Sequence, residues 1–191
     1  MSDGPASAPP SRLRATAEAM ELLRRLGGIH GELMMHQSGG CCDGSSPMCY
    51  PTGEFIVGDR DVLLGLLDLR LGVGEVSQSL PEGADAVPVW ISGSQFDAWK
   101  HTQMILDVVP GRGSGFSLEV PEGLRFLSRG RAFTEDETEL LALDPPLLGA
   151  DWEQGRRPAV PGEASVVAEA ADACPVPGST PQPPLDVTIT T

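Results

Sequence analysis

The sequence predicts an α+β fold, in which one N-terminal helix precedes an antiparallel sheet or a small barrel. Apolar residues recur at helical intervals of three and four near the N-terminus, between residues 11 and 26. Further along, short apolar segments alternate with turns rich in glycine and proline, which is typical of strands. The 191 residues, 40% of them hydrophobic, are enough for one domain with its own core.

The helix is expected to begin at Ser11, which can cap its first turn, and to end where Gly27-Gly28 follows Leu26. Residues 61–71 are rich in leucine and fit either a short helix or a strand, and residues 96–109 are interpreted as a pair of extended segments. The remaining predicted strands are 29–35, 53–57, 87–91, 116–120 and 125–133.

A glycine-rich run at residues 111–115 has a superficial likeness to a nucleotide-binding loop. A dinucleotide fingerprint lies between a strand and a helix, whereas a predicted strand follows this run. The run is therefore interpreted as a hairpin turn.

Three parts are predicted along the chain. Residues 1–10 form a flexible arm, residues 11–140 a single α+β domain, and residues 141–191 an acidic, proline-rich tail that is largely disordered. Trp152 is a candidate anchor of this tail on the domain. The formal net charge is −14, and most of it falls after residue 134.

The charge and hydropathy patterns argue against several functions. Nucleic-acid surfaces need clustered Lys and Arg, so an acidic chain predicts no nucleic-acid partner. No apolar run approaches the roughly 20 residues that cross a bilayer, and the first 14 residues lack the apolar stretch of a secretory signal. These patterns predict a cytoplasmic protein with no membrane partner.

The chemistry of the chain is expected in residues 36–50, HQSGGCCDGSSPMCY, which hold three of the four cysteines together with a histidine and three glycines. Thiolates are nucleophiles and soft metal ligands, and glycine lets a backbone approach a ligand closely. The candidate metal or thiol residues are Cys41, Cys42, Cys49, His36 and His101.

Three interpretations of these residues remain open. A metal ion or an iron–sulfur cluster could be held by Cys41 or Cys42 with Cys49 and one of the two histidines, and a second subunit of a homo-oligomer could supply further ligands. A redox pair could instead join Cys49 to Cys41 or Cys42. The cysteines could also be small, inert, buried residues.

Two stretches carry a resemblance to a known family: HQSGGCCDGSSPMCYP, and the later WISGSQFDAWKHTQMILDVVPGRGSGFSLEVPEGLRFLSRGRAFT. Over about residues 15–134 the chain resembles a small bacterial family catalogued as domain of unknown function 779. Its members are typically encoded beside aldehyde dehydrogenases, and some carry the label acetaldehyde dehydrogenase. The resemblance implies a role in aldehyde or alcohol oxidation with an aldehyde dehydrogenase as partner.

A fainter similarity is to the A-type iron–sulfur carriers of the HesB kind, which also continue from a helix into a glycine–cysteine loop and end with a segment like GFSLEVPEG. This implies a HesB-like fold. The carriers' terminal Cys-x-Cys is replaced here by residues without cysteine, between Ser128 and Phe133. The cluster ligation of that family therefore does not transfer.

The leading hypothesis is an accessory protein of an aldehyde dehydrogenase system, which uses its cysteine-rich segment for metal binding or thiol chemistry. The chain is too short to be a complete aldehyde dehydrogenase and lacks a nucleotide fingerprint. One alternative is a stand-alone enzyme in which a cysteine thiolate attacks an aldehyde and His36 or His101 is the base. The other is a structural binding module.

Overall fold

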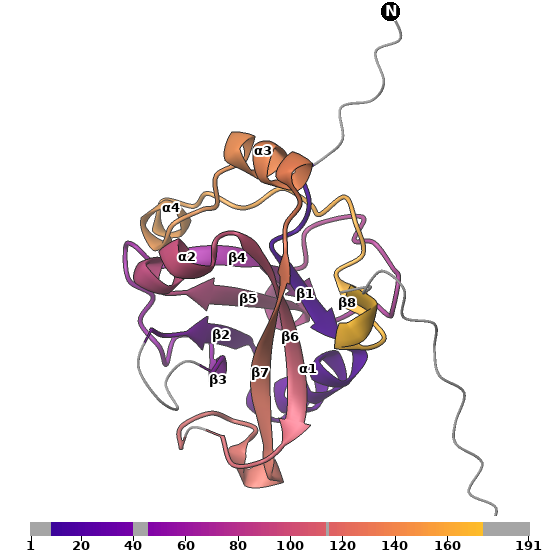
Figure 1. The fold of residues 1–191 in the computed structure, drawn as a ribbon. Coiled ribbons are helices and arrows are strands. Elements are labelled where there is room, and N and C mark those ends of the chain that lie inside the picture. The colour runs from indigo at the N-terminus through magenta and orange to yellow at the C-terminus, as the bar shows by residue number, and fades with distance from the viewer. Residues whose placement is uncertain (1–8, 40–45, 114, 174–191) are drawn as a thin grey trace, which may run out of the picture.

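The computed structural model describes residues 9–39, 46–113 and 115–173. Within these residues the protein has four α-helices and two four-stranded sheets that do not close into a barrel. The strands of the two sheets run in crossing directions, with the long β6/β7 hairpin in front of the second sheet in the view of Figure 1.

The first sheet has the order β7-β6-β1-β8. Strands β6 (Thr102–Pro110) and β7 (Leu124–Ala132) form a nine-residue antiparallel ladder. Strand β1 (Leu13–Thr16) runs parallel to β6 and also parallel to β8 (Val166–Val167). This sheet therefore joins segments from the beginning, the middle and the end of the described chain.

The second sheet has the order β3-β2-β5-β4. Strand β2 (Leu33–Gln37) is antiparallel to β3 (Met48–Pro51) and parallel to β5 (Ala86–Ile91). Strand β4 (Val62–Asp68) is antiparallel to β5, with an irregular register between Leu63 and Gly65. The predicted all-antiparallel sheet is wrong, because long connections bring β1 and β2 beside strands that run in the same direction.

Helix α1 (Ala17–His30) begins six residues after the predicted start. Its N-cap is Thr16, whose hydroxyl accepts a hydrogen bond from the Ala19 N–H at 3.2 Å. Leu13 and Ala15, interpreted as helical from their spacing, are buried in β1. The helix continues through Gly27-Gly28 and ends at Gly31, which has a φ of 81°.

The main core lies between the two sheets and α1. Its fully buried side chains include Met20, Leu23, Met35, Leu106 and Phe126. The sheets approach closely at Gly65, where an added Cβ would lie 3.4 Å from the side chain of Leu13. A smaller cluster covers the outer face of the second sheet around Met34, Leu63 and Trp90.

Several predicted strands are changed by the structure. Residues 87–91 and 125–133 are confirmed as β5 and β7, and residues 61–71 contain strand β4. The segment 96–109 instead divides into helix α2 (Gly93–Trp99) and strand β6. Residues 53–57 and 116–120 are not strands, and the first of them gives way to β3 at residues 48–51. The antiparallel β6 and β7 do flank the glycine-rich run, which confirms a hairpin, with the 3₁₀ turn η3 (Val120–Glu122) in its connection.

Helix α3 (Glu135–Leu143) extends into the stretch predicted as a disordered tail. That stretch also holds α4 (Gly149–Glu153), β8 and the 3₁₀ turn η4 (Ala170–Ala173). The Trp152 ring meets Trp90 edge-on, with centroids 5.7 Å apart, as expected of an anchor. Val166 and Val167 are buried and pair with β1, and this contact stabilises a part of the chain that its composition predicted to be disordered. Residues 1–8 and 174–191 lie outside the described residues, so the three-part division of the chain stays a prediction.

The helices of the described chain include none that is both long and apolar enough to span a membrane.

Replacement of Trp152 by alanine is expected to lower the free energy of unfolding by about 2 kcal/mol, because it removes a half-buried ring from Trp90. Urea unfolding followed by circular dichroism measures this change. The matched control is Trp99→Ala at an exposed ring, which is expected to cost less than about 1 kcal/mol. Equal losses in the two variants would contradict the anchoring role of Trp152.

Candidate functional site

Strand β2 leads into the cysteine-rich segment and places its last two residues on opposite faces of the sheet. His36 pairs in register with Trp90 and Gln37 with Ile91. Trp90 belongs to the outer cluster and Ile91 to the core between the sheets. Because successive side chains of a strand alternate, His36 lies on the outer face and Gln37 on the inner face.

His36 is 3% exposed, and both of its ring nitrogens have partners. Nε2 lies 3.0 Å from Asp61 Oδ2, and Nδ1 lies 3.0 Å from Ser38 Oγ. Burial lowers the pKa of His36, and the hydrogen bond to Asp61 opposes this effect only in part. A neutral ring therefore donates its Nε2–H to the Asp61 carboxylate, and its Nδ1 accepts the Ser38 hydroxyl proton.

The turn at residues 58–61 holds Asp61 in place. The Gly58 N–H donates to Asp61 Oδ2 at 2.8 Å, and the Asp61 N–H donates to the Gly58 carbonyl at 2.9 Å. Two glycines from other elements lie very close to the backbone of this turn. A Cβ on Gly149 would lie 2.2 Å from the Gly58 carbonyl oxygen, and one on Gly93 would lie 2.6 Å from that of Arg60. Only glycine permits these backbones to approach so closely.

The result is a hydrogen-bonded chain of hydroxyl, imidazole and carboxylate, from Ser38 through His36 to Asp61. Phe55 covers the imidazole, with ring centroids 4.3 Å apart. Sites for nucleophilic catalysis have the same order of groups: a nucleophile or proton donor, then a base, then a group that orients the base. Here Ser38, His36 and Asp61 occupy these three places. The arrangement can accept a proton at His36 through Ser38, while Asp61 stabilises the resulting imidazolium.

Cys49 lies on the other face of the sheet from His36. Its register partner is Met35, and its side chain is buried in the core between the sheets. Burial raises the pKa of the Cys49 thiol strongly, and the charge of Glu119 raises it further. The thiol is therefore protonated at neutral pH, which disfavours metal binding or nucleophilic attack by Cys49.

A buried carboxyl group, Glu119, ties the β6–β7 connection to β3. The Ser117 hydroxyl donates a hydrogen bond to the Glu119 carboxyl, and the Cys49 N–H donates to Ser117 Oγ at 2.8 Å. Burial raises the pKa of Glu119. The Leu118 N–H also donates to the Cys49 carbonyl at 3.1 Å, so these contacts hold the connection against the free edge of β3.

The predicted site residues are thus only partly accounted for. His101 is exposed in the turn just before β6 and stacks on Trp99, with ring centroids 6.5 Å apart. Cys41 and Cys42 lie outside the described residues. Where the chain is described, no group of three or more histidine, cysteine, aspartate and glutamate side chains is placed to hold a metal ion. The ligand set that includes Cys41 and Cys42 stays a prediction.

The family model for the domain of unknown function DUF779 matches residues 22–132. The chain belongs to the DUF779 family. The matched part of the DUF779 protein runs from within α1 to the end of β7, and it includes His36, Ser38 and Asp61. No curated protein and no solved structure matches the chain, so the HesB-like fold gains no support from comparison.

Ser38 and Asp61 were not singled out by sequence reasoning. Asp61 lies 25 positions from His36 and follows a turn that has no motif of its own. Ser38 is inside the cysteine-rich segment, but its relation to His36 depends on how the chain leaves β2. No local pattern indicates this contact, because it arises from the packing of the 58–61 turn on the sheet.

The pH dependence of stability is expected to report the buried His36. Its pKa in the folded protein is lowered, so the neutral ring stabilises the fold above the ordinary pKa of about 6.5. This contribution is lost as the pH falls from there through the folded-state pKa. Urea unfolding of the native protein and His36→Gln at pH 7.5 and 5.5 measures it. The native protein should lose more stability on acidification than the variant, and an equal loss would contradict a buried neutral His36.

Substitution of Gly149 by alanine is expected to lower the free energy of unfolding by about 1–3 kcal/mol, because the new methyl group meets the Gly58 carbonyl. The variant should also displace Asp61, which shifts the His36 ring signals in NMR spectra. Gly28→Ala is the matched control, since a Cβ there meets nothing within 4 Å. It is expected to stabilise the helix by about 0.5–1 kcal/mol. A Gly149→Ala protein as stable as the native one would show that the turn is not held in this way.

Proposed function

We propose that this DUF779 protein is an accessory protein of an aldehyde dehydrogenase system that performs thiol chemistry on its partner enzyme. The observation that carries the proposal is the hydrogen-bonded chain from Asp61 through the buried His36 to Ser38, which ends three positions before Cys41 in the sequence. The partner is inferred from the family resemblance, whose members are encoded beside aldehyde dehydrogenases. An aldehyde dehydrogenase depends on a nucleophilic cysteine, which is inactivated by oxidation.

The neutral His36 is suited to be the base of this chemistry. A thiol of Cys41 or Cys42 passes its proton to Ser38 Oγ while the Ser38 proton moves to His36 Nδ1. Asp61 stabilises the imidazolium through Nε2. The thiolate then attacks the glutathione sulfur of a mixed disulfide on the partner's cysteine, the partner's thiolate leaves, and the glutathionyl group is now bound to Cys41 or Cys42 of this protein. A low-molecular-weight thiol such as glutathione supplies the electrons that return this protein to its reduced form.

The geometry supports thiol chemistry more than metal binding. The two ring nitrogens of His36 face Ser38 and Asp61, so a metal ion could bind the ring only if one of these hydrogen bonds broke. Cys49 is protonated in the core and faces away from His36. A metal site would therefore have to be built on Cys41 and Cys42 with ligands other than these two.

Reactivation of an aldehyde dehydrogenase that is encoded beside a member of this family tests the proposal. The enzyme is inactivated as its glutathione mixed disulfide and is then incubated with glutathione and this protein. Because a positioned general base contributes about 10²-fold or more to a rate, His36→Gln should slow reactivation at least about tenfold. The glutamine side-chain amide can still donate a hydrogen bond to Asp61, but the variant has no atom in place of Nδ1 to accept the Ser38 proton. Cys41→Ser or Cys42→Ser should have the same effect, while the matched control Cys174→Ser should not.

Several results would contradict the proposal. An equal rate of reactivation with the native protein and with an equally folded His36→Gln variant would show that His36 is not the base. Stoichiometric zinc or iron in protein purified without oxygen would favour the metal interpretation. Oxidation of an aldehyde by the protein alone, lost in Cys42→Ser, would favour the stand-alone enzyme. Variants of Cys41 and Cys42 that change nothing would favour a structural module.

A further inference from the structure

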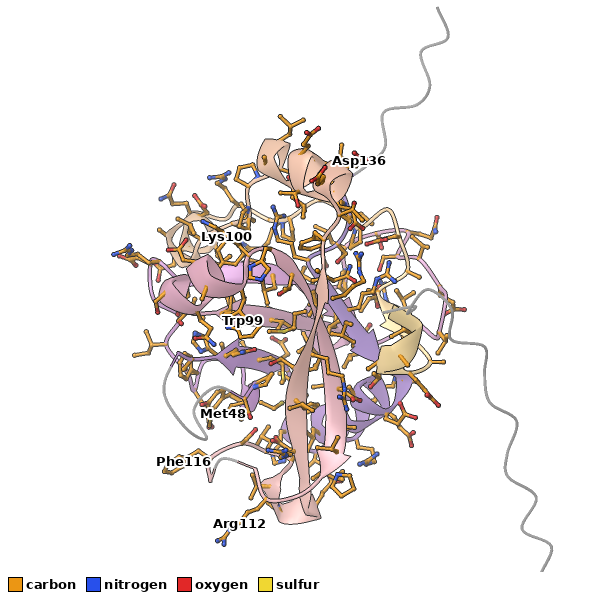
Figure 2. All side chains as sticks on the ribbon, viewed as in Figure 1. Met48, Trp99, Lys100, Arg112, Phe116 and Asp136 are labelled. Atoms are coloured by element: carbon orange, nitrogen blue, oxygen red, sulfur yellow. The ribbon has the colours of Figure 1, made fainter. Side chains whose placement is uncertain are left out.

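A cavity of about 240 Å³ opens on the inner side of β2, between the two sheets and helix α2. This exceeds the roughly 150 Å³ that suffices to bind benzene in an engineered protein cavity. Its walls are mainly apolar, and α2 closes one side with two aromatic rings. Figure 2 labels Trp99, the last residue of α2, and Lys100, which follows it, near this helix. The apolar lining side chains are Leu64, Ile91, Phe96, Trp99, Met104 and Leu127.

One polar side chain in the wall of the cavity lacks a partner. Gln37 is 5% exposed, and its Oε1 is buried without a hydrogen-bond partner among the described residues. Its main-chain carbonyl is already used, since it accepts the Ser92 N–H at 3.0 Å. A buried amide oxygen without a donor is costly, and native proteins rarely leave one unless a ligand or water completes it. The wall of this mainly apolar cavity therefore includes a side chain whose buried oxygen has no hydrogen-bond donor among the described residues.

The cations at the cavity are engaged elsewhere. Arg12 donates to the carbonyl oxygens of Leu141 at 3.0 Å and Asp144 at 2.6 Å. Arg129 is paired with Asp107 at 2.7 Å, and the exposed Lys100 lies 3.5 Å from Asp97. An anionic ligand would have to displace one of these partners. An uncharged ligand fits the wall without any such loss.

We propose that this cavity binds a small, uncharged alcohol, whose hydroxyl group donates a hydrogen bond to Gln37 Oε1 and whose apolar part packs on Phe96 and Met104. The Gln37 Nε2 can in turn donate to the same hydroxyl oxygen. The site is on the opposite face of β2 from His36, so it does not depend on the thiol function. It gives the protein a binding activity for a neutral small molecule.

The test uses three probes of similar size on the full-length protein: benzyl alcohol, toluene and benzoate. Titrations followed by ¹H–¹⁵N NMR measure each dissociation constant from the signals of the Gln37 side-chain amide and the Trp99 indole. Benzyl alcohol is expected to bind about fivefold tighter than toluene, the ratio for one hydrogen bond. Benzoate is expected to bind more weakly than both. No saturable shift with benzyl alcohol, or tighter binding of benzoate, would overturn the proposal.

Two variants separate the hydrogen bond from the apolar packing. Gln37→Leu removes the amide and should lower the ratio of the two affinities to about one, with toluene still bound. The control Gln78→Leu makes the same change at an exposed position outside the cavity and should keep the ratio. His36→Gln should also keep it, so loss of thiol function and loss of binding are distinguishable. A Gln37→Leu protein that still prefers benzyl alcohol would refute the role of Gln37.

Discussion

The parallel pairing of β2 with β5 is the constraint on which both sites depend. Trp90 and Ile91 are buried on opposite faces of the second sheet, which fixes the register of the pair. A shift by one residue would exchange His36 and Gln37 between the faces and would bury a histidine in the main core. With the register fixed, β2 places the imidazole of His36 on one face of the sheet and the amide of Gln37 on the other.

The chain of Ser38, His36 and Asp61 depends on a second constraint, which is the close packing of backbone around residues 58–61. Gly93 at the start of α2 and Gly149 at the start of α4 both approach carbonyl oxygens of this turn. Helix α4 therefore contributes to the position of Asp61, although it follows the matched family domain in sequence. The position of Asp61 in turn affects His36 through their hydrogen bond, because burial and this hydrogen bond determine the pKa of the ring.

The sequence predicted the presence of most elements better than their boundaries or pairing. Strands β5 and β7 follow from short apolar runs, and α1 from its spacing. The residues of β1 were predicted as part of the helix because Leu13 and Ala15 continue the helical spacing. Only their pairing with β6 shows that they form a strand and not a helical turn. Of the candidate site, His36 was identified as a neighbour of the cysteines. Asp61, Ser38 and Gln37 were not, since their roles arise from contacts between segments and from an amide left unpaired by packing.

The central claim is that His36, through Ser38, activates a thiol of the cysteine-rich segment. It is tested most directly by the pH profile of iodoacetamide alkylation at Cys41 and Cys42, resolved by mass spectrometry, in the native protein and His36→Gln. The account predicts that at least one of these thiols is alkylated at least about tenfold faster at neutral pH in the native protein than in the variant, because the neutral His36 takes the thiol proton through Ser38 as the thiol attacks. Profiles that superimpose in the two proteins would contradict the account.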